Sequence, residues 1–237
     1  MQSIPSRGTV LGRLLRWPLD RVPGTTAIRI PFGPLRGARW TREAGIHSAW
    51  LGLYERAKVR EFASVLRAGD TVFDVGAHAG YYSLLALRAG ARVVAVEPNP
   101  SNRGFLANHF AMNDFHDGVC VVDSAVGGSV GTVRFDVSGS YVGSISEAGS
   151  VEVAVTTLDE LARAHGQPDL IKIDVEGAEG DVLFGAPQVL ARGTTLFLAL
   201  HGPEQRATCL ELLADQGYEV TDVAGDPMEV LARPKAR

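Results

Sequence analysis

From Gly69 onward, the chain alternates between two hydrophobic periodicities. Short apolar segments rich in β-branched residues predict strands at Thr71–Val75, Arg92–Val96, Val119–Val122, Leu170–Ile173, Thr195–Leu200, Tyr218–Val223 and Glu229–Ala232. Between the strands, segments with helical spacing predict helices at Tyr81–Arg88, Ser101–Met112, Leu158–His165, Ala178–Phe184 and Gln205–Gln216. Strands that are apolar on both faces belong to sheets covered by helices on both sides. The alternation therefore predicts an α/β fold with a doubly wound, mostly parallel sheet.

The residues that precede this alternation form a distinct N-terminal extension. Residues 1–68 are expected to pack on a core of residues 69–237, so that the whole chain is one domain. The extension contains a Pro/Gly-rich stretch with a predicted hairpin at Ala27–Pro31 and Ala38–Thr41, and a predicted helix at Tyr54–Leu66.

The strand–helix alternation is interrupted between Gly127 and Thr156, and this segment predicts a small β insertion. Two expected strands, Thr132–Val137 and Val151–Val155, bracket a Gly/Ser-rich segment. Such a segment is either a plain flexible loop or a lid beside a ligand crevice. Tyr141 lies within it and is a candidate for shaping the mouth of a pocket.

Composition narrows the class of protein. The 237 residues carry 23 Lys+Arg against 27 Asp+Glu, a formal net charge of −4, which disfavours a nucleic-acid partner. The apolar content of 46% is that of a globular chain. Arg13 and Arg16 interrupt the only candidate export signal, and no apolar run is long enough for stable membrane insertion. We expect a cytoplasmic protein with two reduced cysteines, whose oligomeric state the sequence leaves open.

A glycine-rich turn follows the first parallel strand. Residues 74–80 read DVGAHAG, with Gly76 and Gly80 flanking His78 and with Asp74 near the strand end. Glycines at this position let the backbone approach a ligand closely. The G-x-G-x-x-G spacing of nicotinamide-binding turns is missing. Asp74 is poorly suited to a pyrophosphate and better suited to a ligand with ammonium and sulfonium groups.

Acidic residues also follow the second and third strands. Glu97 lies about 20 residues after the turn, where a carboxylate binds a ribose diol in dinucleotide folds. The alternative is a solvated glutamate at a strand end. Asp123 and Ser124 follow the third strand and are candidates for contacting an adenine edge, although such pairs are also common in plain turns.

A second group of polar residues lies in the segment LIKIDVEGAE. If the strand stays extended, Lys172, Asp174 and Glu176 share one face. Alternating charges on a buried strand indicate either a polar site or a buried Lys–Asp pair with a helix-capping glutamate. His201 ends the next strand and is expected either to reach the same edge or to be an ordinary loop histidine.

The sequence resembles the FkbM-type S-adenosylmethionine-dependent methyltransferases, a family of class I Rossmann-like methyltransferases. The resemblance covers roughly residues 30–203 and rests on TVFDVGAHAGYYSLLA, VVAVEPNP, TTLDEL and DLIKIDVEGAEGDVLFGA. It implies cofactor binding by Asp74, Gly76, Gly80 and Glu97, and site acids at Asp174 and Glu176. It also implies O-methylation of a small molecule, sugar or polyketide-type natural product.

The chain departs from the family pattern at two positions. His78 replaces the usual asparagine, which exchanges one polar turn residue for another. Ala199 stands where the family commonly has a glutamate two residues before the histidine of the fifth strand. The second departure weakens any model that needs a carboxylate from that strand, including some metal-site models.

We expect the protein to align the acceptor hydroxyl and remove its proton. Asp174 is the first candidate for the general base and His201 the second, with Lys172 orienting Asp174. Mg²⁺ held by Asp174 and Glu176 is a further possibility, although no dense ligand cluster is visible. Glu176, Tyr141 and Tyr54 are candidate substrate contacts, together with Trp40.

Three other functions are compatible with the same sheet. A nicotinamide-dependent oxidoreductase would share the ribose-binding acid, but the dinucleotide turn is missing. A non-catalytic interaction protein is disfavoured because polar residues follow both strands. A nucleic-acid methyltransferase is disfavoured by the acidic balance, and the N-terminal arginines predict a solvated arm or a membrane-surface contact.

Overall fold

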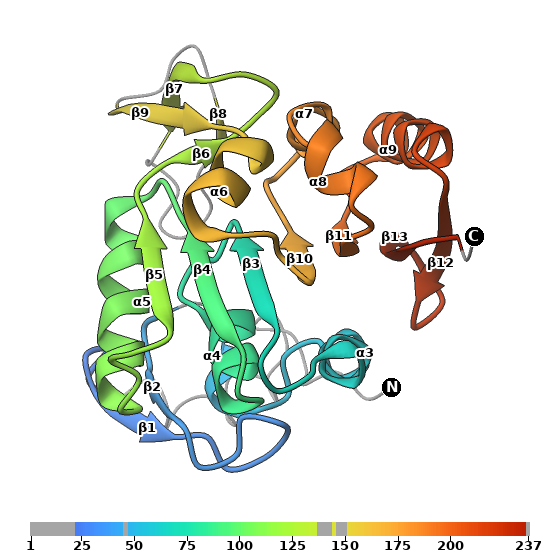
Figure 1. Ribbon diagram of the computed structural model, residues 1–237. Coiled ribbons are helices and arrows are strands. Elements are labelled where there is room, and N and C mark those ends of the chain that lie inside the picture. The colour runs from blue at the N-terminus through green and yellow to red at the C-terminus, as the bar shows by residue number, and fades with distance from the viewer. Residues whose placement is uncertain (1–21, 45–46, 137–143, 146–150, 236–237) are drawn as a thin grey trace.

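The centre of the molecule is a seven-stranded sheet, shown in Figure 1. The computed structural model describes residues 22–44, 47–136, 144–145 and 151–235. The strand order is β12-β13-β11-β10-β3-β4-β5, and the neighbours from β11 to β5 pair in parallel while β13 is antiparallel to β11 and β12. The predicted doubly wound, mostly parallel sheet is therefore confirmed. The strands are β3 (Thr71–Val75), β4 (Arg92–Val96), β5 (Val119–Val122), β10 (Leu170–Ile173), β11 (Thr195–Ala199), β12 (Tyr218–Val223) and β13 (Asp226–Pro234).

Helices cover both faces of this sheet. Along β3, Val72 packs in one buried cluster and Phe73 in another, as expected for side chains that alternate across a strand. The first cluster includes helix residues from α3 (Arg56–Val65), α4 (Tyr81–Arg88) and α5 (Pro100–Met112). The second includes residues from α6 (Leu158–His165), α7 (Glu179–Phe184), α8 (Pro187–Ala191) and α9 (Pro203–Asp215). None of the described helices is long and apolar enough to cross a membrane.

The N-terminal extension packs on the first of these two faces. Strands β1 (Ala27–Arg29) and β2 (Arg39–Thr41) form the predicted antiparallel hairpin, which lies beside α5 in Figure 1. The imidazole of His109, on α5, stacks on Trp40 with ring centroids 3.9 Å apart and accepts a hydrogen bond from the amide of Thr41 at 2.9 Å. The short helix α2 (His47–Trp50) and α3 complete the extension.

The β insertion forms a second, smaller sheet beyond the end of β5 (Figure 1). Its strand order is β6-β9-β7-β8, with bounds Ala125–Val126 for β6, Gly131–Asp136 for β7, Ser144–Ile145 for β8 and Val151–Thr156 for β9. Most of the predicted Gly/Ser-rich segment, including Tyr141, lies outside the described residues.

Four short elements were not expected from the sequence: helices α2 and α8 and strands β6 and β8. Helix α8 begins at Pro187, which favours the first turn of a helix, but its five residues are too few for a clear apolar period. Strands β6 and β8 have two residues each and depend on pairing with β9 and β7. Such pairs are set by tertiary contacts and leave almost no local pattern.

The strand order reverses between β3 and β10, which places a ligand crevice at this point. From β3 the chain proceeds outward through β4 and β5, and from β10 it proceeds the other way through β11. In open α/β sheets, ligands bind beyond the carboxyl ends of the strands at such a reversal.

An ion pair joins the extension to the far side of the sheet. Lys58, on α3, lies 2.6 Å from the carboxylate of Glu229, on β13, and 3.3 Å from Glu55. The Glu229 side chain is only 10% exposed. Burial raises the pKa of Glu229 from 4.5 to about 7, and the nearby charge of Lys58 only partly offsets this effect.

This raised pKa predicts a pH-dependent stability. Between about pH 4.5 and 7 the folded chain keeps a proton on Glu229 that the unfolded chain has lost, so the free energy of unfolding falls as the pH rises through that window. Replacing Glu229→Gln removes this contribution. From pH 5 to 8, we expect the stability of the variant to rise relative to the unmodified protein by roughly 1–3 kcal/mol, measured by urea denaturation.

Glu219, an exposed residue on the neighbouring strand β12, supplies the control. The Glu219→Gln variant should follow the unmodified protein at every pH. A constant stability difference between Glu229→Gln and the unmodified protein across the pH range would show that Glu229 does not titrate as described.

Candidate active site

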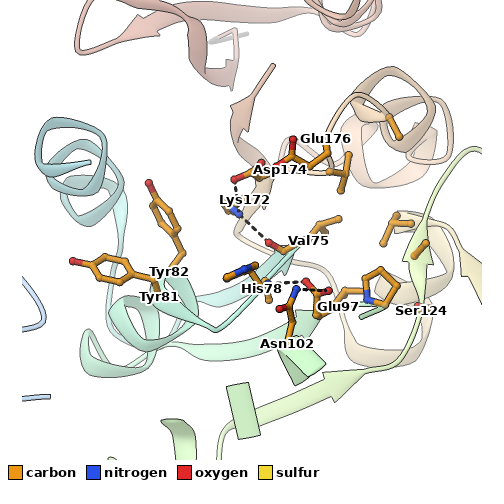
Figure 2. A pocket seen from close by; sticks show the side chains of 18 of the residues that line it. Val75, His78, Tyr81, Tyr82, Glu97, Asn102, Ser124, Lys172, Asp174 and Glu176 are labelled. Carbon is orange, nitrogen blue, oxygen red and sulfur yellow. Dashed lines mark hydrogen bonds and ion pairs between the residues drawn. The ribbon is translucent and has the colours of Figure 1, made fainter. Parts of the chain in front are cut away.

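A cavity of about 270 Å³ lies at the carboxyl ends of the central strands. Its walls come from the turn after β3, the ends of β4 and β10, the start of the β insertion and the N-terminal extension. One end, which we name the Glu97 end, contains Glu97, Asn102 and Ser124. The other, the Asp174 end, contains Asp174 and Glu176; Figure 2 shows His78 beside Glu97 and Lys172 beside Asp174.

The glycine-rich turn forms the floor of the cavity. Gly76 has a φ of 75°, and a Cβ at this position would lie 1.8 Å from the carbonyl oxygen of Asp174. His78 and Gly80 also have positive φ values, and Gly80 precedes the first turn of α4. Gly76 and His78 line the cavity, whereas Gly80 acts through its backbone conformation. The turn thus requires a residue without a side chain where it passes the end of β10.

Glu97 is buried at one end of the cavity, where a set of hydrogen bonds holds its carboxylate in place. The His78 amide donates to its Oε2 at 2.7 Å, and the Asn99 amide and the Asn102 side chain donate to its Oε1 at 2.9 and 3.3 Å. Burial raises the pKa of Glu97, and these hydrogen bonds oppose the rise. Because a carboxylate accepts about four hydrogen bonds, Glu97 retains acceptor capacity for a ligand.

Asp74 does not line the cavity, so the predicted direct contact with a cationic ligand is not present. The side chain lies on the face of β3 that α4 covers, and its residue is 1% exposed. Its Oδ2 accepts a hydrogen bond from Ser83 at 2.6 Å, and its Oδ1 lies 3.7 Å from the ammonium of Lys172. Asp74 instead supports the cation behind the turn.

Of the two residues after β5, only Ser124 lines the cavity. Its hydroxyl is buried and has no hydrogen-bond partner within the described part of the chain, which leaves it available to a ligand. Asp123 points outward, with a side chain that is 65% exposed and an ion pair to Arg103. The predicted role of Asp123 at the cavity is therefore not supported by its position.

Lys172 is a buried cation between two carboxylates. Its side chain is 7% exposed; the ammonium lies 3.3 Å from Asp174 and donates to the carbonyl of Gly76 at 3.2 Å. It also lies 5.2 Å from the centre of the Tyr82 ring. Burial alone would lower the pKa of Lys172, but the charges of Asp174 and Asp74 outweigh burial and raise it. Lys172 is thus a permanent positive charge that orients Asp174.

The expected alternation of charges along β10 holds only as far as Asp174. The strand ends at Ile173, and Glu176 has a φ of 54° in the turn that follows. This turn, rather than an extended strand, brings the Glu176 carboxylate back to the cavity. Burial alone would raise the pKa of Asp174, but the charges of Lys172 and His201 hold it below its usual range.

His201 reaches the same edge from the end of β11. Its Nε2 lies 3.7 Å from Oδ1 of Asp174 and 3.4 Å from Oε2 of Glu176. A hydrogen bond with Glu179 raises the pKa of His201 to about 9, against an opposing effect of burial. The imidazole therefore carries a proton at neutral pH, which disfavours His201 as the general base.

Glu179 is a site residue that the sequence reasoning missed. It is fully buried at the start of α7, and its Oε1 lies 2.9 Å from Nδ1 of His201 and accepts a hydrogen bond from the amide of Gly177. One carboxylate thus fixes both the turn and the imidazole. A glutamate within an apolar helix segment, three residues after Glu176, was the signal available in the sequence.

Aromatic side chains form part of the cavity wall, and the Tyr82 ring lies next to Lys172, which holds Asp174. Trp40 and Tyr54 line the cavity together with Tyr81 and Tyr82, and the predicted contact of Tyr54 with a substrate stays a prediction. The Tyr81 ring makes edge contacts with both Trp40 and Tyr54, at centroid distances of 5.7 and 5.1 Å. The hydroxyl of Tyr82 lies 3.2 Å from Glu55. The cavity therefore combines flat apolar surfaces with a carboxylate held by a cation.

Solved structures of methyltransferases share the fold. The precorrin-6y C5,15-methyltransferase of Geobacter metallireducens superposes with a TM-score of 0.52 at 16% identity, over 77% of this chain and 90% of that one. The ribosomal protein L11 methylase of Lactobacillus delbrueckii subsp. bulgaricus gives 0.52 at 15% identity, over 81% of each chain. At such low identity these similarities concern the fold alone: a class I Rossmann-like methyltransferase fold.

Sequence comparison is more specific. The chain is 24% identical over 187 residues to the hexuronic acid methyltransferase AglP of Haloferax volcanii. The aligned region covers 76% of this chain and 77% of that protein. The model of the methyltransferase FkbM domain matches residues 74–220, from the end of β3 into β12. This match includes Glu97, Lys172, Asp174, Glu179 and His201. The chain therefore belongs to the FkbM-domain family of methyltransferases.

Proposed function

We propose that this methyltransferase transfers the methyl group of S-adenosylmethionine to a hydroxyl of a sugar or other small molecule. The observation that carries the proposal is the single cavity that has Glu97 at one end and the Lys172-bound Asp174 at the other. A place in natural-product biosynthesis in the cytoplasm, predicted from the sequence, is part of the same proposal.

The Glu97 end fits a nucleoside. Two carboxylate oxygens can accept from the two adjacent hydroxyls of a ribose, and Glu97 is fixed in place by three hydrogen bonds from its own chain. The unpartnered hydroxyl of Ser124 lies in the same cavity and can donate to, or accept from, an adenine edge. These groups support the binding of an adenosyl cofactor.

The Asp174 end fits a hydroxyl acceptor. When bound, S-adenosylmethionine supplies a methyl group that is already activated, so the remaining tasks of the protein are alignment and proton removal. Asp174 is ionised and reaches the cavity, and Lys172 fixes its orientation. Of the two candidate bases, Asp174 is therefore preferred over the protonated His201. A positioned base contributes roughly 10²–10⁴-fold to the rate of such a step.

A sugar is the acceptor class that best matches the walls of this end. The ring of Tyr54 can pack against the C–H face of a sugar ring, while the carboxylates of Asp174 and Glu176 accept hydrogen bonds from its hydroxyls. The printed name of the Haloferax relative, a hexuronic acid methyltransferase, supports the same class.

Replacing Glu97→Ala tests the cofactor assignment. Loss of the hydrogen bonds to a charged acceptor is expected to weaken S-adenosylmethionine binding by about 10–100-fold, measured by isothermal titration calorimetry. Glu61→Ala, at an exposed position on α3, is the matched control and should bind as the unmodified protein does. Unchanged affinity in a folded Glu97→Ala variant would refute the assignment.

Replacing Asp174→Asn tests the proposed base. Screening hexoses, hexuronic acids and nucleotide-activated sugars for release of S-adenosylhomocysteine first identifies an acceptor. With that acceptor, the variant is expected to lose about 10²–10⁴-fold in kcat. Its affinity for S-adenosylmethionine should stay within about threefold, because the substitution lies at the other end of the cavity.

Asp181→Asn, an exposed position on α7, is the control for the Asp174 variant. It should retain full turnover. If Asp174→Asn keeps its turnover, or instead loses cofactor affinity, Asp174 is not the base.

A further inference from the structure

Three side chains with atoms that can bind a metal ion converge where the ends of β10 and β11 meet. One carboxylate oxygen each of Asp174 and Glu176 and a ring nitrogen of His201 all lie within 4.8 Å of one another. We propose that these three residues bind a divalent cation that holds the oxygen of the methyl acceptor; Asp174 would contribute Oδ1, while its Oδ2, which faces Lys172, remains the proposed base. The role of the cation rests on the proposed methyl transfer, whereas its binding does not.

Glu179 prepares His201 to act as a ligand. Its buried Oε1 lies 2.9 Å from Nδ1 of the imidazole, and its Oε2 lies 3.4 Å from the backbone amide of the same residue. Histidines that bind metals typically donate their other ring N–H to a carboxylate, which fixes the tautomer and the ring orientation. Here that contact leaves Nε2 facing Asp174 and Glu176. Glu179 is 0% exposed, so its only evident task at this edge is to hold the turn and this ring.

The distances within the cluster fit ligands of a shared ion better than hydrogen bonds. Nε2 of His201 lies 3.4 Å from Glu176 and 3.7 Å from Asp174, which is beyond the roughly 2.7–3.2 Å of an N–H···O bond. Ligand atoms at right angles, each about 2.1–2.4 Å from a cation, are about 3.0–3.4 Å apart. Small rotations of the two carboxylates would therefore be enough to close the site around an ion.

Charge favours a cation at this place. Three carboxylates, those of Asp174, Glu176 and Glu179, surround His201, and the opposing positive charges are the protonated imidazole and the ammonium of Lys172, which is shared between Asp174 and Asp74. The cluster thus has more negative than positive charge in its immediate surroundings. A divalent ion would balance this excess and still leave coordination positions open.

The ligand set indicates the kind of ion. Two carboxylate oxygens suit Mg²⁺ or Mn²⁺, and the imidazole nitrogen shifts the preference to Mn²⁺. The side chains of Asp174, Glu176 and His201 are 30–42% exposed, so water or an acceptor hydroxyl can reach the remaining positions. Because Asp174 and Glu176 also line the cavity, an oxygen bound to the ion would lie at the Asp174 end.

Binding of Mn²⁺ to the metal-free full chain tests the proposal directly. After treatment with a chelator, titration with Mn²⁺ at about pH 8, where the bound ion must displace the proton that His201 still carries, is followed by electron paramagnetic resonance. We expect one saturable site. Glu176→Gln and His201→Asn should each weaken Mn²⁺ binding at least tenfold, while circular dichroism shows that they are folded.

Exposed residues of the same types serve as controls. Glu211→Gln and His116→Asn remove one carboxylate and one imidazole elsewhere on the surface and should leave Mn²⁺ binding unchanged. Absence of saturable binding overturns the proposal, and so does binding that survives Glu176→Gln. Because the Glu176 side chain is 42% exposed, its replacement keeps the test informative even if His201→Asn does not fold.

Affinity for S-adenosylmethionine, measured on the same metal-free protein, separates the two proposals. Tight cofactor binding without a Mn²⁺ site would refute the cation and leave the methyl transfer intact. A Mn²⁺ site without cofactor binding would refute the proposed function and leave the cation site standing.

Discussion

The burial of one positive charge organises the edge of the sheet where the cavity lies. A lysine that is 7% exposed is tolerated only when its charge is compensated, and the ammonium of Lys172 contacts Asp74 and Asp174 and donates to the carbonyl of Gly76. Lys172 and Asp74 are direct neighbours in the parallel pairing of β10 with β3. One cation therefore links two strands and the turn, and loss of either carboxylate would leave the ammonium with one charged partner instead of two.

The same contact explains why local sequence could predict the strands but not every site residue. The apolar period of β3 and β4 is independent of the neighbouring strands, and both were predicted with their observed bounds. Alternation along β3 also places Asp74 on one definite face. Whether that face meets a ligand or a helix depends on α4, which covers it and supplies Ser83. The assignment of Asp74 to the cavity was wrong for this reason.

Long-range contacts also determine the geometry of the acidic cluster. Lys172, Asp174 and Glu176 all line the cavity, but their spacing implied an extended strand, and the chain instead turns at Glu176 with a positive φ. The partner that fixes this geometry, Glu179, reaches His201 across 22 residues of sequence. A pairing over that separation has no local pattern, because it exists only once β10 and β11 lie side by side.

The structure also bears on the alanine that departs from the family pattern. Ala199 pairs with Glu229 in the antiparallel register of β11 and β13, so their side chains share one face as cross-strand neighbours. Although β11 lacks the usual glutamate, a carboxylate is present one strand away, within electrostatic influence of Asp174. Its ion pair with Lys58 also gives the N-terminal extension a direct part in this edge of the sheet. Glu229 therefore occupies, from the neighbouring strand, the face of the sheet on which a glutamate at position 199 would lie.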